Sequence, residues 1–122
     1  MKSQRDRGRE WFEKVMGFPA PAGPAGTDPF LDATVDHLFG DVWSRPGLSV
    51  RDRRLVTLAL LIQLGSEPTL RLHLQATMRQ KQLTDAEIDE LLLHVAHYAG
   101  WPGAAVASQI VRQLRAERDA AG

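Results

Sequence analysis

The hydrophobic positions of this chain recur with a helical period, and no stretch shows the strict alternation of a half-buried strand. Apolar residues three or four apart, separated by charged residues, predict an amphipathic helix over residues 3–16. The same spacing and the residues at the segment ends predict five more helices. They cover residues 28–43, 49–64, 66–80, 84–100 and 104–118. We therefore expect an all-α protein of about six helices.

A segment rich in proline and glycine separates the first helix from the rest. Residues 17–27 cannot continue a helix and indicate a linker or an arm. Asp28 and Pro29 then restart the helical pattern, with Asp28 as the N-cap and Pro29 at the first helical position. The sequence thus predicts an N-terminal helix with a Pro/Gly-rich arm over 1–27 and a helical domain over 28–122.

Short motifs mark the boundaries of the later helices. Thr84 and Glu87 have the spacing of a capping box at the start of the fifth helix. Ser66 can cap the fourth helix. The stretch 100–103 contains two glycines and a proline, and it is expected to interrupt the chain before the last helix begins at Ala104.

The helix over residues 55–64 is apolar on nearly every side. Such a helix must be covered all round, and a domain of 122 residues has few elements with which to cover it. We therefore expect a homo-oligomer whose interface completes the core.

Composition narrows the class of protein further. The chain has 15 basic and 15 acidic residues, so its net charge of zero gives no overall basic surface for nucleic acid. Its longest apolar run, 55–64, is too short to cross a bilayer, and no signal-peptide pattern opens the sequence. The absence of cysteine excludes disulfides and thiol chemistry. We expect a cytoplasmic protein without nucleic-acid or membrane partners.

One helix carries a group of residues suited to acid/base chemistry. At about 100° per residue, Glu90, His94 and His97 fall on one narrow stripe of the fifth helix, and Trp101 would continue it. His73 lies in the preceding helix. Imidazoles titrate near neutrality, and a carboxylate beside one fixes its tautomer. We predict that His73, His94, Glu90 and His97 form a catalytic group, although packed histidines are the alternative.

The same residue types also occur in metal sites. Imidazole and carboxylate ligands suit zinc, iron or manganese. Helical di-metal sites, however, use Glu-x-x-His pairs, and this spacing does not occur in the chain. We therefore expect neither a metal nor another cofactor.

Arginines and aromatic residues could complete a binding site for an acid. Cations in the first turns of the 49–64 helix oppose the helix dipole unless an anion meets them. Surface charges or intersubunit ion pairs are the alternative for each arginine, and the aromatic side chains could equally belong to the core. The predicted substrate-binding residues are Arg53, Arg71, Trp43, Tyr98 and Trp101.

Several stretches, in order and spacing, match a known family. They are Phe30–Asp32, Gly40–Leu48, Arg53–Leu61, Leu70–Leu74 and Glu87–Ala104. Over residues 30–114 the chain resembles the carboxymuconolactone decarboxylase family. The resemblance implies an alkylhydroperoxidase-like all-α fold, a ring-like homo-oligomer, typically a trimer or hexamer, and a cofactor-free lyase acting on a carboxylated γ-lactone. The Cys-x-x-Cys pair of the peroxidase branch is absent, so we do not expect a thiol peroxidase.

Some positions depart from the pattern of the decarboxylases that the chain resembles. An Asn-Asn-Gly turn usually precedes the histidine helix there, whereas this chain has residues 79–82 without glycine. Position 97 is usually aliphatic. These departures near the expected pocket indicate a changed substrate.

Taken together, the residues and the resemblance predict a decarboxylase for a small carboxylated lactone or cyclic oxo acid. His73 and His94 would move protons while Glu90 orients one of them, and Arg53 and Arg71 would hold the carboxylate. Two alternatives stay open. One is a lactone isomerase or cyclase with the same acid/base pocket, and the other is a non-catalytic oligomeric binding protein.

Overall fold

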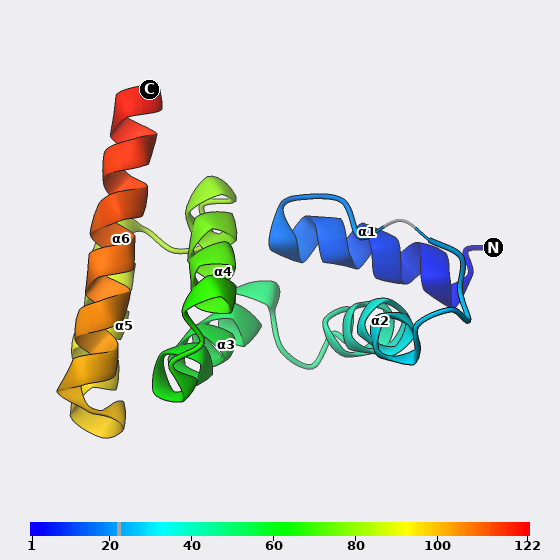
Figure 1. Ribbon diagram of the computed structural model, residues 1–122, viewed down its shortest axis with the longest axis horizontal. Coiled ribbons are helices and arrows are strands. Elements are labelled where there is room, and N and C mark those ends of the chain that lie inside the picture. Colours follow the sequence, from blue (N-terminus) through cyan, green and yellow to red (C-terminus); the bar gives the residue numbers. More distant parts are fainter. Residues whose placement is uncertain (22) are drawn as a thin grey trace. The chain divides into compact units, whose positions relative to one another are not determined.

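The computed structural model describes residues 1–21 and 23–122. Within these residues the chain is helical and contains no strand, which confirms the all-α prediction (Figure 1). The elements are α1 (Gln4–Met16), α2 (Pro29–Asp32), the π-helix η1 (Ala33–Val42), α3 (Val50–Leu64), α4 (Glu67–Arg79), α5 (Asp85–Ala99) and α6 (Trp101–Ala121). They form two compact units, 1–53 and 54–122.

In the first unit, α1 packs against η1 around an aromatic core. The Phe12 ring lies 4.8 Å from that of Phe39, which stacks on Trp43 at 6.3 Å. The two helices approach closely at Gly8, where a Cβ atom would lie 2.0 Å from the backbone oxygen of Val35. Any larger residue there would separate α1 from η1.

The predicted helix over 28–43 forms in two registers. Asp28 caps it as expected, because its carboxylate accepts the N–H groups of Phe30 and Leu31. From Ala33 onwards the backbone adopts the wider π-helical pattern, which ends where the N–H of Trp43 donates to the oxygen five residues earlier. The sequence showed no signal for this register.

In the second unit, α5 and α6 lie side by side as an antiparallel pair, and α4 packs against α6 (Figure 1). One face of each helix meets a common apolar core, as the helical period predicted. Its most deeply buried members are Leu58, Ile62, Leu70, Leu74, Ile88, Ala107 and Val111.

The predicted start of α5 is confirmed, and Ser66 is the N-cap residue of α4 as predicted, but without a side-chain hydrogen bond. The Thr84 hydroxyl accepts the N–H of Glu87, whose carboxylate accepts the N–H of Thr84. The Ser66 side chain makes no capping hydrogen bond. Its backbone oxygen accepts the N–H of Leu70, which is the first hydrogen bond of the helix.

The last helix begins earlier than predicted. Gly100 alone breaks the chain, with a positive φ of 105°, and α6 starts at Trp101 rather than at Ala104. Pro102 lies in the first turn, where a missing N–H group costs no helical hydrogen bond.

Part of α3 is exposed although it is apolar. Val56, Leu60 and Leu64 keep 55%, 57% and 75% of their surface accessible in the single chain. This apolar face is the feature for which we expected an oligomer, and the oligomer stays a prediction. In the part of the chain that the structure describes, no helix combines the length and apolarity that a membrane crossing needs.

Candidate functional site

The second unit holds a buried contact between an imidazole and a guanidinium. Arg54 on α3 is completely buried, and His73 on α4 keeps 7% of its surface exposed. Nη1 of Arg54 lies 2.8 Å from Nδ1 of His73. A guanidinium only donates hydrogen bonds, so Nδ1 is the acceptor, and the neutral imidazole carries its proton on Nε2.

Further hydrogen bonds hold this pair in place. Nε of Arg54 donates to Oε1 of Gln82 at 2.8 Å. The Thr77 hydroxyl donates to the backbone oxygen of His73 at 2.6 Å. The pair is therefore anchored from α3, from α4 and from the turn that follows α4.

Burial and charge set the protonation of both groups. Burial lowers the pKa of the Arg54 guanidinium to about 10, so it stays charged at neutral pH. Burial, and after it the positive charge of Arg54, lower the pKa of His73 to about 4. At pH 7 the site is thus a neutral imidazole beside a cation, and the imidazole can accept a proton once an anion offsets that cation.

The predicted stripe on α5 is exposed. The His94 ring stacks on Tyr98 at 5.1 Å, and the His97 ring meets the Trp101 ring edge-on at 5.8 Å. Nδ1 of His97 donates to the backbone oxygen of Leu93 at 2.7 Å, which places a proton on that nitrogen. The exposed stripe consists of Glu90, His94, His97 and Trp101.

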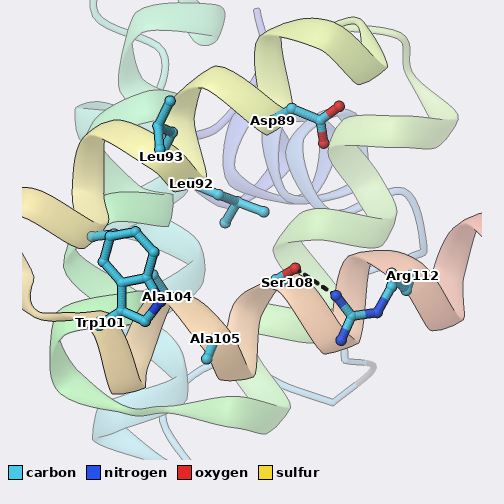
Figure 2. Close-up of a pocket in the computed structure, with 9 residues that line it drawn as sticks. Asp89, Leu92, Leu93, Trp101, Ala104, Ala105, Ser108 and Arg112 are labelled. Atoms are coloured by element: carbon cyan, nitrogen blue, oxygen red, sulfur yellow. Dashed lines mark hydrogen bonds between the residues drawn. The ribbon is translucent and has the colours of Figure 1, made fainter.

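A groove of about 340 Å³ lies beside this stripe, between α5 and α6 (Figure 2). Its floor is formed by leucine and alanine side chains. Trp101 lies on its wall, and Nη1 of Arg112 donates to the Ser108 hydroxyl at 2.9 Å. Of the predicted site residues, Trp101 lines this groove, and its ring contact with His97 joins the groove to the stripe.

The predicted catalytic residues thus fall into two groups. His73 lies in the interior beside Arg54, whereas Glu90, His94 and His97 are at the surface of α5. Across residues 1–21 and 23–122, no group of three or more histidine, aspartate or glutamate side chains is arranged to hold a metal ion.

The predicted substrate-binding residues are more dispersed. Arg71 on α4 donates to Gln113 and lies 3.8 Å from the Glu117 carboxylate, both on α6. Arg53 donates to the backbone oxygen of Arg45 within the first unit. There Trp43 is a core residue, while Tyr98 in the second unit is 84% exposed. Binding of a substrate by these residues stays a prediction.

Arg54 and Gln82 are not among the site residues predicted from the sequence. A signal for Arg54 existed, because it precedes Leu58 by four residues and Ile62 by eight, and these three are the buried residues of α3. The apolar character of α3 on all sides concealed this spacing. No sequence signal pointed to Gln82, because its contact with Arg54 joins positions 28 residues apart.

By fold and site, this is an all-α protein with a buried imidazole–guanidinium pair and an exposed histidine stripe. The profile of the carboxymuconolactone decarboxylase family matches residues 28–113, which is more than half of the chain. The chain belongs to this family, which confirms the resemblance and is consistent with its alkylhydroperoxidase-like fold. Both groups of candidate residues lie within the matched region.

The chain is similar in sequence to two decarboxylases. The chain is 43% identical to the 4-carboxymuconolactone decarboxylase of Acinetobacter baylyi over 76 residues, which are 62% of this chain and 56% of that protein. It is 33% identical to the nitrosuccinic acid decarboxylase of Metarhizium robertsii over 106 residues, which are 87% of this chain and 70% of that protein. The chain thus spans little more than half the length of the first relative.

Proposed function

We propose that this chain is a decarboxylase for a small carboxylated substrate and that His73 transfers the proton. The observation that carries the proposal is the buried contact of His73 with Arg54, within the region that matches a decarboxylase family. Of the two, His73 keeps some exposed surface and Arg54 none. His73 is therefore the group that contacts the substrate. Arg54 acts on the imidazole of His73 through the hydrogen bond between them.

The proposed role of His73 follows from the anion that forms when a substrate loses CO2. When the bond to the carboxylate breaks, CO2 leaves and its electron pair moves to a neighbouring acceptor group. The resulting anion must then gain a proton. An anionic substrate at His73 offsets the field of Arg54 and so raises the pKa of the imidazole. The imidazole already carries a proton on Nε2, which it donates to the anion while Nδ1 keeps its hydrogen bond from Arg54, and Nε2 then regains a proton from water.

The names of the two relatives indicate substrates of this kind. A lactone in 4-carboxymuconolactone and a nitro group in nitrosuccinic acid can both accept an electron pair from the carbon that loses CO2. We therefore propose a carboxylic acid with such an acceptor group as the substrate class. No cofactor is part of this proposal.

The test is CO2 release by the purified chain from 4-carboxymuconolactone and from nitrosuccinic acid, followed by mass spectrometry of the product. We expect release from one of these acids and a product lighter by one CO2. A product of unchanged mass would contradict decarboxylation and would indicate a lactone isomerase or cyclase. No turnover of either acid would contradict the proposed substrate class.

We also propose that the exposed stripe, a second group separate from the buried pair, takes part in the reaction, with His94 and His97 as further proton carriers, Glu90 orienting one of them, and Tyr98 and Trp101 as walls. Replacing His94 with alanine is expected to lower turnover strongly.

The melting temperature of this variant should stay nearly unchanged, because substitutions at exposed positions alter stability by about 0.5 kcal/mol or less. Steady-state kinetics and thermal unfolding measure the two effects. Full activity of His94→Ala would exclude the stripe from the reaction and leave His73 as its proton carrier.

A further inference from the structure

The chain makes a defined turn where α4 ends, which we call the α4 end turn (residues 80–82). The N–H of Lys81 donates to the oxygen of Met78 at 3.2 Å, and the N–H of Gln82 donates to the oxygen of Thr77 at 3.1 Å. These two bonds form a Schellman motif. Its left-handed position, usually a glycine, is occupied by Lys81 with a φ of 55°.

The residue that follows the left-handed position commonly packs an apolar side chain back on the helix. In this chain that residue is Gln82, and its side chain makes polar contacts instead. Its oxygen Oε1 accepts the Nε–H of Arg54 at 2.8 Å, and its nitrogen Nε2 donates to Oε1 of Gln80 at 3.3 Å. These two contacts fix which end of the amide faces the guanidinium.

The hydrogen bond between Arg54 and Gln82 determines how the Arg54 guanidinium is oriented toward His73. A guanidinium is planar, so hydrogen bonds at two of its nitrogens fix both its position and the direction of its plane. Gln82 holds Nε, and Nη1 then points at Nδ1 of His73. Because the carboxamide is neutral, it orients the cation without offsetting its charge.

We infer that Gln82 is a positioning residue for the proposed decarboxylation: it acts through Arg54 to hold the His73 imidazole in the tautomer with its proton on Nε2. This inference rests on the proposed function for its effect on turnover. Its structural part, the link from Gln82 through Arg54 to His73, is measurable without turnover. The α4 end turn supports it, because the turn attaches Gln82 to Thr77, which is itself bonded to the backbone of His73.

The test compares Gln82→Met with Gln82→Glu in the chain of 122 residues. Methionine fills similar space without an acceptor, whereas glutamate keeps an acceptor and adds a charge. Gln63→Met is the matched control, because Gln63 is an exposed residue of α3. The measurements are the ¹⁵N shifts of the His73 ring, the exchange rate of the Arg54 Nε–H, and kcat and KM separately.

In Gln82→Met we expect faster exchange at Arg54, a mixture of His73 tautomers, and a kcat lowered by about tenfold or more with little change in KM. In Gln82→Glu we expect the Arg54 Nε–H to stay protected while the pKa of His73 rises, since the carboxylate offsets the guanidinium. Gln63→Met should match the unsubstituted chain in every measurement.

A single His73 tautomer and slow Arg54 exchange in Gln82→Met would overturn the inference, and so would a lower melting temperature with unchanged kcat. If Gln82→Met does not fold, Gln82→Glu decides: an unmoved pKa of His73 overturns the inference. Failure of the proposed function has a different signature. The spectroscopic changes would then appear as expected, while neither named acid loses CO2 even with the unsubstituted chain.

Discussion

Replacing His73 with asparagine is expected to lower kcat for CO2 release by about 10²- to 10⁴-fold, the usual contribution of a general acid or base. The asparagine Oδ1 can take the place of Nδ1 and accept the hydrogen bond of Arg54, so the buried cation keeps a partner. The variant loses the ring nitrogen that transfers the proton. Steady-state kinetics with the acid that the unsubstituted chain decarboxylates, together with circular dichroism to confirm the fold, measure the effect.

His37→Asn is the matched control for this experiment. The His37 side chain is 68% exposed and lies in the first unit, so the same substitution there should leave kcat unchanged. A folded His73→Asn variant with full turnover would contradict the role of His73. Equal losses in both variants would show that the effect does not come from the buried pair.

Acidification from pH 7 to pH 4 is expected to remove up to about 3 kcal/mol of folding free energy through His73 alone. The pKa of His73 is about 4 in the folded chain and 6.5 in an unfolded one. The unfolded state therefore binds the proton first as the pH falls. The contribution of His73 to the folding free energy is complete above pH 6.5 and is lost progressively towards pH 4.

Urea unfolding at several pH values between 7 and 4 measures this dependence, with the His73→Asn variant as the reference. The burial of His73 beside Arg54 causes this pH dependence. The unsubstituted chain should therefore lose stability more steeply with falling pH than the variant. Asp32 and Asp85, whose pKa values hydrogen bonds from Arg5 and Arg118 lower, titrate alike in both proteins and cancel in the comparison. Parallel curves would show that His73 does not titrate abnormally.

Local sequence signals predicted most of the helices, because they act within a few residues. The capping box at Thr84 and the Asp28 cap formed as expected. Ser66 lies at the N-cap of α4 without a side-chain hydrogen bond, and α6 starts at Trp101 rather than at Ala104. Both helices carry a proline in the first turn, which needs no hydrogen-bond donor there, and neither has a side-chain cap.

The candidate site was predictable only in part. The stripe of Glu90, His94 and His97 lies on one surface of α5 because it depends on the period of a single helix. The pairing of His73 with Arg54 depends on which side of α3 faces α4, and an apolar helix does not reveal that side. Arg53 was the predicted substrate-binding residue of α3, but its neighbour Arg54 is the one that is buried in the second unit.

By itself, the sequence determined the all-α class, the family and the residue types available for chemistry, because periodicity, capping and matching stretches are properties of the chain read in order. Only the tertiary structure decided which of those residues meet. Packing buried Arg54 against His73, and the left-handed turn after α4 brought Gln82 to the same guanidinium. The physical reason is that the burial of His73 and its proximity to the charge of Arg54, which together lower the pKa of His73, arise only when separate helices pack together.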